Sequence, residues 1–388
     1  TSLSAYFPHA RAALQAYAEA IYLMTDDINL FHLQPSTEMF PIHSEEFTIA
    51  ADSFIAKYIQ DPKLRSVVAY MNPLYGGRSD ETPAYIHAII SRLYMQGASR
   101  FAGGSDKFTD LLTSVIESAG GEVHTNEGVE WVEINNRHVD YVRTKKGNTY
   151  QADYYISAIH PCSLLRLMPE NSFPKAYRTR LNSIPNSYSA FSVYIKLKPC
   201  TFPYINHSEY FMRRYVDIWN FGQHNKVWPL GFLFMTPPNE QQGEYADKAL
   251  VTIPMLYDEV AKWEETEVGK RGTDYEAWKE EKARDLLALI EELHPGFSAC
   301  VDKINIASPL TIRDYYGSKE GSMFGFSKDY KNIALSQVPV VTKVDNLLLT
   351  GQNNGLPGFC GVPLTAINTV EAILGQNYIL NRINECVK

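Results

Sequence analysis

One short segment near the C-terminus constrains the fold most. Leu347 to Thr350 is an apolar stretch of strand length, and a loop with four glycines in eleven residues follows it, from Gly351 to Gly361. A helix is predicted from about Pro363 to Leu374, with proline at its first position. The loop glycines would let backbone N–H groups approach a ligand, and the helix N-terminus carries partial positive charge. A tight strand-to-helix turn is the simpler explanation of such a loop, but four glycines exceed what that turn needs.

The segment from Gly103 to Pro161 is the second informative region. Gly103-Gly104-Ser105 precedes a predicted helix that Gly120-Gly121 ends. The glycine pair would let a cofactor ring lie against the backbone, although a plain turn before the helix is the simpler interpretation. The strands expected next are Glu122 to Thr125, Val129 to Ile134, His138 to Arg143 with a turn at Asn135-Asn136, and Tyr154 to Ile159. The last run is apolar without alternation, which predicts a parallel strand covered on both faces. This order is typical of the middle of a two-part dinucleotide-binding domain.

The remaining chain predicts a helical layer and an antiparallel sheet. Helices are expected at Pro8 to Met24, Ser53 to Tyr70 and Thr82 to Met95, and a long helix at Tyr275 to Leu293, with Thr273 and Glu276 as its capping box. Strands are expected at Phe191 to Leu197, Tyr210 to Trp219, Gly231 to Met235 and Ala249 to Met255. The fold class predicted is therefore α/β plus α+β.

Composition excludes several classes of function. A chain of 388 residues predicts two or three structural units, and its net charge of −8 argues against nucleic acid as a partner. Five scattered cysteines without a CxxC pair indicate reduced thiols in a cytosolic setting. No apolar run reaches the length of a membrane span. The chain starts at Thr1, so we expect that an upstream segment has been removed.

Several catalytic motifs are missing from the sequence. It holds no GxGxxG after a strand, no GxxxxGK[ST], no GxSxG and no HExxH. The ten histidines include no pair at metal-ligand spacing near carboxylates, so we expect no metal site. No side chain can be named as catalytic. The 25 tyrosines, 18 phenylalanines and 5 tryptophans fit an apolar substrate tunnel and a large core equally well.

Four stretches together resemble the carotenoid and retinoid branch of the flavin amine-oxidase superfamily, which includes phytoene desaturase, carotenoid isomerase and retinol saturase. The stretches are Tyr94-Met95-Gln96-Gly97 through Gly103-Gly104-Ser105 to Gly120-Gly121, Ala152 to Ala158, Ser308 to Tyr315 with Gly321-Ser322, and Leu349 to Gln352 with Gly361 to Ala366. They span nearly the whole chain in the expected order. The last two are most similar to retinol saturase-like proteins.

The resemblance implies FAD as the cofactor and assigns residues to it. The backbone of Val129 would hold the adenine, and Ser157 and Ala158 would lie near the adenosine. Gly351 and Gln352 would approach the diphosphate and the ribityl chain. Gly361, Val362 and Leu364 would abut the isoalloxazine, and Gly103 and Gly104 complete the set of cofactor-binding candidates.

The resemblance also implies domains and a reaction. The flavin-binding, Rossmann-like domain of the glutathione-reductase type would take residues 100–165 and 345–388 and would lack its first βαβ unit. Residues 1–99 and 166–344 would form the substrate domain. The reaction implied is hydride transfer between flavin N5 and an apolar polyene or isoprenoid-like substrate.

Two other functions stay open: a non-catalytic prenyl or lipid carrier of the same fold, and a related amine oxidase. We expect a cytoplasmic protein, with peripheral membrane contact as an open alternative. The chain as it stands, without the first βαβ unit, is expected to be inactive and to lack FAD.

Overall fold

The chain divides into two compact units. The computed structural model describes residues 3–36, 44–224 and 227–386. The first unit comprises residues 1–96, 128–187 and 316–388, and the second comprises residues 97–127 and 188–315. Each unit is assembled from segments that are far apart in the sequence. The predicted division into a flavin domain and a substrate domain concerns what each part binds rather than its compactness, and it stays a prediction.

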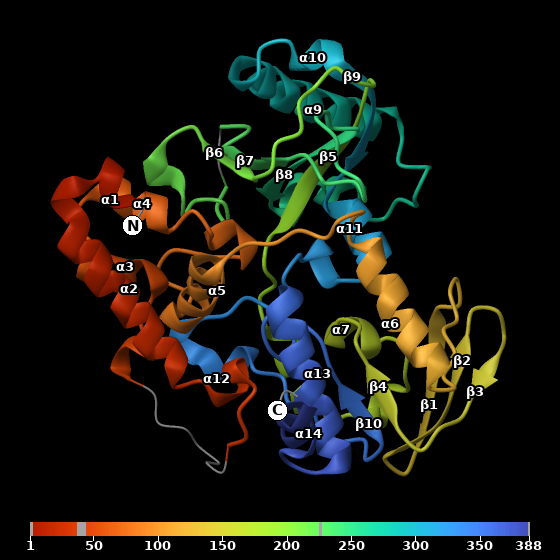
Figure 1. Ribbon diagram of the computed structural model, residues 1–388. Helices are drawn as coiled ribbons and strands as arrows, with labels where there is room; N and C mark the ends of the chain where they lie inside the picture. The colour runs from red at the N-terminus through yellow and green to blue at the C-terminus, as the bar shows by residue number, and fades with distance from the viewer. Residues whose placement is uncertain (1–2, 37–43, 225–226, 387–388) are drawn as a thin grey trace. The chain divides into compact units, whose positions relative to one another are not determined.

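A layer of helices opens the first unit (Figure 1, red to orange). Helix α2 packs against α3 and α5 through an apolar stripe that buries Tyr17, Ile21 and Met24. The layer comprises α1 (Leu3–Tyr6), α2 (Arg11–Asp26), α3 (Ala51–Tyr58), α4 (Pro62–Val68) and α5 (Ala84–Gln96). The helices predicted at Pro8 to Met24 and Thr82 to Met95 are confirmed as α2 and α5. Three of their four ends lie within two residues of the predicted positions.

The helix predicted from Ser53 to Tyr70 is wrong as a single element. It is broken between α3 and α4, where Asp61 has extended backbone angles and its carboxylate accepts hydrogen bonds from the N–H groups of Lys63 (2.8 Å) and Leu64 (3.1 Å). Pro62 follows as the first residue of α4. A residue before proline is driven out of the helical region, and aspartate is a preferred N-cap, so the two residues start a new helix.

A three-stranded antiparallel sheet belongs to the same unit. Strands β1 (Val129–Asn135), β2 (His138–Thr144) and β3 (Thr149–Tyr150) pair in sequence order. The β1–β2 turn was predicted at Asn135-Asn136 but lies one residue later, because Asn135 still pairs with His138. Its residues Asn136 (48°) and Arg137 (63°) have positive φ, as a two-residue type I′ hairpin requires. The strand predicted at Glu122 to Thr125 is wrong: this exposed stretch has no strand to pair with in the described chain.

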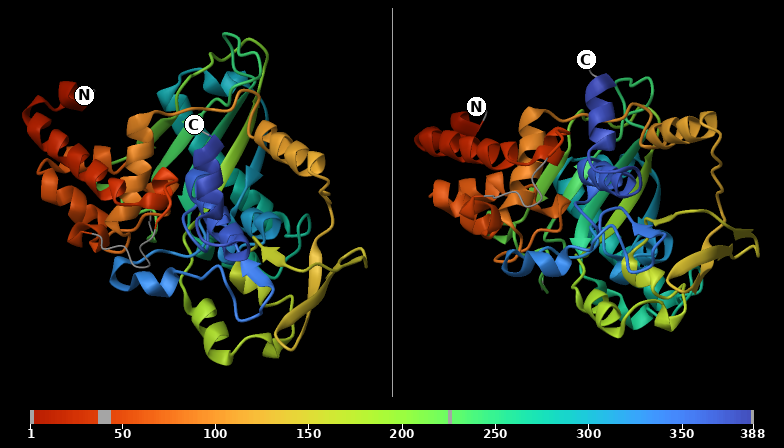
Figure 2. Two further views of the ribbon diagram at one scale, coloured as in Figure 1. Left: turned by 60° about the horizontal axis from the view of Figure 1, so that its bottom comes forward. Right: turned by 90° about the horizontal axis from the view of Figure 1, so that it is seen from below.

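A pair of parallel strands lies beside the C-terminal helices. Strand β4 (Tyr155–Ser157) pairs with β10 (Leu347–Leu349), and α13 (Gly358–Leu374) and α14 (Tyr378–Cys386) follow β10. Figure 2 shows α14 turned sharply away from α13 (both blue). The strand predicted from Leu347 is confirmed as β10, and the predicted end of the following helix at Leu374 is also confirmed. The start predicted for that helix, Pro363, is wrong, because α13 begins at Gly358. Pro363 lies in the second turn of α13, where the missing N–H removes one intrahelical bond and leaves the first turn intact.

Apolar side chains under the two sheets hold this part of the first unit together. Val132 and Val139 of the hairpin, Leu347 and Leu349 of β10, and Leu181 belong to one buried cluster. Short helices border it: α7 (Pro161–Leu164), α8 (Lys175–Ser183) and α12 (Ile333–Ser336). The side-chain amide of Asn346 accepts a hydrogen bond from the Val139 N–H (2.8 Å) and donates to the Val139 carbonyl (3.0 Å). This clamp fixes β2 against the start of β10.

A buried histidine joins β4 to the rest of this core. His160 caps α7: its Nδ1 accepts a hydrogen bond from the Cys162 N–H (3.2 Å), and its Nε2 lies 3.0 Å from Oδ1 of Asn186. This pair of partners fits the neutral ring with the proton on Nε2. Burial, with a smaller contribution from Lys319 and Arg166, lowers the pKa of His160 to about 4.

The segment Met323 to Phe326 supports the glycine loop from below. Asn353 is buried, and its Oδ1 accepts a hydrogen bond from the Phe326 N–H (3.2 Å). Gly325 has φ of +70°, and an ideal Cβ at this position would lie 2.4 Å from Oδ1 of Asn353. The contact therefore needs glycine both for its backbone angle and for its missing side chain.

The second unit is built on a five-stranded antiparallel sheet in the order β6-β7-β8-β5-β9. Phe191 on β5 contacts Trp278 of the long helix α9 edge to face, with ring centroids 6.0 Å apart. The strands are β5 (Ser189–Leu197), β6 (Glu209–Met212), β7 (Gly231–Met235), β8 (Lys248–Met255) and β9 (Val301–Ala307); the helices are α6 (Asp106–Ser118), α9 (Thr273–Leu293), α10 (Phe297–Cys300) and α11 (Pro309–Tyr316). Strand β8 alternates buried and half-buried residues, as a sheet with one covered face requires.

Three expectations for this unit need correction. The strand predicted from Tyr210 to Trp219 ends at Met212, and a 3-10 turn follows. Strand β9 was not predicted, because its charged and polar residues interrupt the apolar pattern. The capping box of α9 does not form: Gly272, with φ of +91°, is the N-cap, so Thr273 already occupies the first helical position.

Replacing Gly325 with alanine should destabilise the protein more than the same change at Gly147. Both glycines have positive φ, +70° and +86°, so each alanine is strained by about 1 kcal/mol. Only the Cβ at 325 also collides with Asn353, whereas nothing lies within 4 Å at 147. We expect Gly325→Ala to lower the free energy of unfolding by about 3 kcal/mol and Gly147→Ala by about 1 kcal/mol. Urea titration measures both, and equal losses would contradict the packing described.

Acidification should destabilise the protein through His160. Its folded pKa of about 4 lies below the ordinary value of 6.5, so its contribution is complete above pH 6.5 and is lost as the pH falls toward 4. The slope attributable to this ring is at most about 1.4 kcal/mol per pH unit. Asparagine can also cap α7 but does not titrate, so the unfolding free energy of His160→Asn should fall less steeply below pH 6.5. Identical slopes for the two proteins in urea titrations would refute this account.

Candidate functional site

The ends of the two parallel strands bring four predicted site residues together. Leu349 pairs with Ser157, and the Thr350 N–H donates to the Ser157 carbonyl (2.9 Å). Gly351 follows with φ of +91°, and its ideal Cβ would lie 3.5 Å from the Ala158 carbonyl. Gln352 is the next residue. Ser157, Ala158, Gly351 and Gln352 thus lie at the carboxyl ends of parallel strands, the edge at which α/β sheets bind ligands.

Gln352 is fixed by the segment below the loop. Its side-chain amide lies between the Met323 carbonyl (3.2 Å) and the Gly325 N–H (3.3 Å), and it satisfies both groups with its nitrogen toward Met323. The side chain is therefore occupied within the protein. The backbone of Gly351 and Gln352, rather than the Gln352 side chain, is the part that can approach a ligand.

Two of the four loop glycines are required by packing of the loop on its own helix. An ideal Cβ at Gly355 would lie 2.3 Å from Oγ1 of Thr365, and one at Gly361 would lie 2.1 Å from the Leu356 carbonyl. The other two, Gly351 and Gly358, have positive φ instead, and the space around the Gly358 Cβ position is open. The glycine content of the loop therefore has structural causes, and it does not by itself indicate a ligand.

The first turn of α13 has the properties of a ligand seat. Pro357 precedes it, and no side chain caps the helix. The N–H groups of a first helical turn have no partner within the helix, and the helix dipole makes that end partly positive. Val362 is 38% exposed and Leu364 is half-buried, so apolar surface lies next to these amides. A negatively charged or electron-rich group beside an apolar ring fits this combination.

Hydrogen bonds hold α13 in place on β10. The Thr369 hydroxyl donates to the Leu349 carbonyl (3.1 Å), and the Thr365 hydroxyl donates to the Gly361 carbonyl (3.0 Å). Both threonines are buried. The N-terminus of α13 is thereby fixed relative to the ends of the parallel strands.

The other predicted site residues lie elsewhere. Val129 is the first residue of β1, pairs with Thr144 and is 37% exposed. Gly103 and Gly104 lie in the second unit, in the turn before α6, with φ of +83° and +100°. An ideal Cβ at Gly103 would contact the Glu240 side chain at 2.9 Å, so a local packing role explains this glycine.

Strand β4 has one free edge. Within the described chain β4 pairs with β10 alone, whereas the far side of β10 is covered by Val340 and Val341, since the Leu349 N–H donates to the Val340 carbonyl (2.8 Å). Tyr154 is 51% exposed and Ile156 is 48% exposed. The prediction that this run is covered on both faces is therefore wrong for the structure as it stands. An apolar parallel strand with an open edge is unusual, because parallel sheets are normally buried.

A hollow in the helical layer of the first unit was not predicted. It has a volume of about 910 Å³ and is lined by residues of α1, α2, α4 and α5. His87 lies next to it and is fully buried; burial lowers the pKa of this ring to about 4. The sequence signal was weak, because one histidine in an apolar helix is usually a core residue with satisfied partners.

Lys328 is a second group that the sequence did not single out. Its ammonium donates to the Ser336 carbonyl (3.0 Å), and burial lowers its pKa to about 8. It lies two residues after Phe326, whose backbone N–H donates to Oδ1 of the loop residue Asn353. Lys328 can therefore gain and lose a proton near neutral pH in the neighbourhood of the glycine loop.

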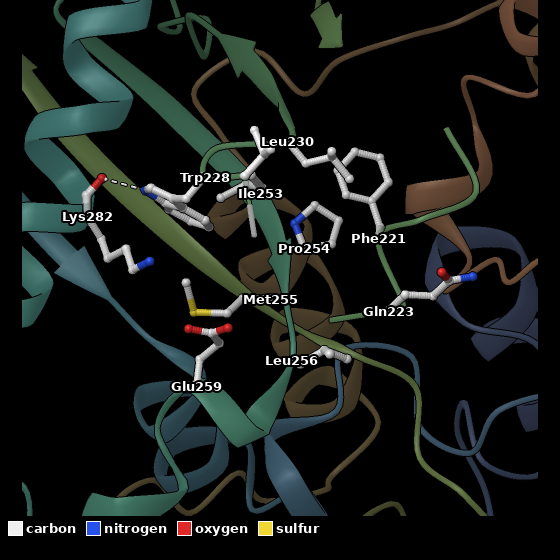
Figure 3. Close-up of a pocket in the computed structure, with 11 residues that line it drawn as sticks. Phe221, Gln223, Trp228, Leu230, Ile253, Pro254, Met255, Leu256, Glu259 and Lys282 are labelled. Atoms are coloured by element: carbon white, nitrogen blue, oxygen red, sulfur yellow. Dashed lines mark hydrogen bonds between the residues drawn. The ribbon is translucent and has the colours of Figure 1, made fainter. Parts of the chain in front are cut away.

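The second unit contains a smaller hollow of about 50 Å³ (Figure 3). Apolar side chains of Trp228, Ile253 and Met255 face it, and the Trp228 indole N–H donates to the Lys282 carbonyl (3.1 Å). Its volume suits a few water molecules or a small side chain. It is too small for a drug-sized ligand.

Within the described residues, no three histidine, cysteine or acidic side chains are grouped as a metal ion would require. In the same part of the chain, no individual helix is long and apolar enough to cross a membrane, and α13 and α14 pass that test only as a pair bent by 117°.

Comparison with known proteins gives relatives along most of the chain. All-trans-retinol 13,14-reductase of Rattus norvegicus is 24% identical over 411 residues, which covers 96% of this chain and 67% of the relative. The human protein of that name is 25% identical, and 4,4'-diaponeurosporene oxygenase of Staphylococcus aureus is 24% identical; 85% and 71% of this chain are covered. The chain spans 59% and 54% of the length of these last two relatives.

Solved structures share the fold at low sequence identity. An oxidoreductase from Methanosarcina mazei matches 83% of this chain and 68% of its own, with a TM-score of 0.56 and 16% identity. Cyclohexylamine oxidase from Brevibacterium oxydans matches 97% of this chain and 75% of its own, with a TM-score of 0.53 and 11% identity. The mixed helix and sheet architecture is thus that of amine oxidase-type flavoproteins.

The family described as flavin containing amine oxidoreductase matches residues 9–288. This match covers more than half of the 388 residues. The chain therefore belongs to the flavin containing amine oxidoreductase family.

Proposed function

We propose that this protein is the larger part of an FAD-dependent oxidoreductase that acts on an apolar, polyene or isoprenoid-like substrate. The observation that supports it most is the parallel pair β4–β10, which leads through Gly351 to the uncapped N-terminus of α13. The retinol reductases and the diaponeurosporene oxygenase among the relatives suggest the substrate class.

The free edge of β4 suggests how the flavin domain is completed. We expect a further parallel strand to pair with Tyr155 to Ser157, and the helix of the same unit to cover Ile156, as the first βαβ unit of a Rossmann-like domain would. The relatives are longer than this chain and have room for it. In this proposal residues 100–165 and 345–388 belong to the flavin domain, and residues 1–99 and 166–344 to the substrate domain.

The residues of this chain would bind and orient the cofactor. Gly351 and Gln352 would face the diphosphate and ribityl chain with their backbone, and Ser157 and Ala158 would border the adenosine. Val129 would hold the adenine. Gly361, Val362 and Leu364 would place the first turn of α13 against the isoalloxazine, where its positive end favours electron density. Bound FAD would supply the acceptor or donor of a hydride, while apolar walls keep water out.

FAD binding is expected to depend on completion of the sheet. Residues 1–388 alone should show no heat of FAD binding by calorimetry, because the free β4 edge lacks the strand and helix that hold a diphosphate. A protein extended upstream by its natural sequence should purify yellow, and its absorbance should correspond to about one flavin per protein chain. Micromolar FAD binding by residues 1–388 would contradict the first expectation. A folded, colourless extended protein would favour the carrier function instead.

The substrate class can be tested separately on the flavin-loaded, extended protein. A conjugated polyene such as all-trans-retinol is added under anaerobic conditions to the oxidised and, separately, to the reduced enzyme. We expect the flavin spectrum to change in one of these two mixtures. Primary amines such as cyclohexylamine and putrescine should leave it unchanged. Bleaching by an amine, with peroxide formed in air, would instead assign the protein as an amine oxidase.

A further inference from the structure

We propose that the hollow in the helical layer of the first unit is a binding site for an apolar molecule that ends in a single neutral hydroxyl group. Its lining residues come from α1, α2, α4, α5 and the turn after α4. These helices are drawn in red to orange in Figure 1. The proposal concerns binding alone, and it stands whether or not the chain binds FAD.

The size and the walls of this hollow suit an isoprenoid-sized ligand. Its volume of about 910 Å³ lies at the upper end of the range usual for small-molecule sites. Leu14, Val68 and Met71 contribute apolar wall, and Tyr70 and Tyr94 add aromatic surface. A molecule with a long apolar body can therefore place apolar surface against these walls.

One side of the hollow carries a cluster of hydroxyl groups. Tyr17 and Ser91 both line it, and the Ser91 hydroxyl lies 3.4 Å from Nε2 of the buried His87. The Tyr17 hydroxyl lies 2.5 Å from Nε2 of His87, whose Nδ1 lies 3.0 Å from the Tyr75 hydroxyl. These side chains come from two helices and the turn after α4, so the surrounding packing fixes their orientation.

The cluster is electrically neutral. Burial lowers the pKa of His87 to about 4 and raises the pKa of Tyr17 well above its usual range, so neither carries charge at neutral pH. A buried carboxylate or ammonium beside them would lack a counter-charge and would be strongly disfavoured. A neutral hydroxyl can both donate to and accept from Tyr17 and Ser91, so it matches this wall.

The charged residue among the lining residues lies in a different environment. Arg11 is exposed to solvent, and it forms no ion pair in the described chain. A ligand with an acidic end would have to place that end at Arg11, in water, rather than against Tyr17. The two orientations give opposite orders of affinity for an alcohol and an acid of the same carbon skeleton.

The packing of the hollow also connects it to the glycine loop. Met71, which lines the hollow, belongs with Tyr75 and Ile86 to a buried cluster against which Leu356 packs. Leu356 is also the residue whose carbonyl requires glycine at position 361. The hydroxyl cluster and the start of α13 are therefore supported by the same side chains.

The test uses the intrinsic fluorescence of all-trans-retinol titrated with the whole chain, residues 1–388. Retinyl methyl ether and retinoic acid provide the same skeleton without the hydroxyl donor or with a charge. We expect retinol to bind about three- to tenfold more tightly than the ether, as one hydrogen bond would give, and more tightly than the acid. Tighter binding of the acid, or no saturable binding of retinol, would overturn the proposal.

Variants locate the site. Tyr17→Phe keeps the ring and should reduce the preference for retinol over the ether to less than about twofold. Ser91→Ala provides a second test that leaves the contact between Tyr17 and His87 in place, and circular dichroism checks the folding of both. Ala18→Trp should fill the hollow and abolish binding of all three ligands. Ala16→Trp, at an exposed position of the same helix, should leave binding unchanged. Unchanged affinity in Ala18→Trp, or an unchanged preference in both hydroxyl variants, would refute the assignment.

Discussion

The pairing of β10 with β4 brings Ser157, Ala158, Gly351 and Gln352 of the candidate site together. Each strand is three residues long, and two such strands are marginal on their own. Their pairing is stabilised from outside: Leu347 and Leu349 enter a buried cluster, and Asn346 clamps Val139 of the hairpin. The Thr369 hydroxyl then fixes α13 to the Leu349 carbonyl. The position of the first turn of α13 thus depends on contacts made by residues outside that turn, on β10 and further along α13.

The glycine loop shows how a local signal can have mixed causes. Gly355 and Gly361 are needed because the loop packs closely on α13, and Gly351 and Gly358 because their φ is positive. Neither cause requires a ligand. What supports a cofactor seat is instead the position of the loop at the carboxyl ends of parallel strands, and the helix end without a side-chain cap.

Elements with strong periodic patterns could be predicted from the sequence, and elements that depend on distant partners could not. The ends of α5 and of the hairpin strands β1 and β2 followed from local patterns. The break at Asp61-Pro62 carries two helix-start signals, but the apolar pattern that continues across it predicts a single helix. Strand β9 depends on its pairing with β5, and the Glu122 to Thr125 segment fails as a strand because it has no partner. For the site, the sequence indicated Gly351 and the α13 region, but the grouping of Tyr17, His87 and Tyr75 arises only from the packing of the helical layer.

The two unusual features of the first unit have different chemical requirements. The free edge of β4 presents backbone N–H and C=O groups, and another strand satisfies such groups with regular geometry. The hydroxyl cluster beside the large hollow is already satisfied by internal hydrogen bonds, so it remains stable with solvent there and accepts a neutral ligand at little cost. A carrier and an oxidoreductase could both use the hollow. A carrier of the same fold would have its β4 edge completed as well, so the two functions differ in whether the completed sheet binds FAD and not at the pocket.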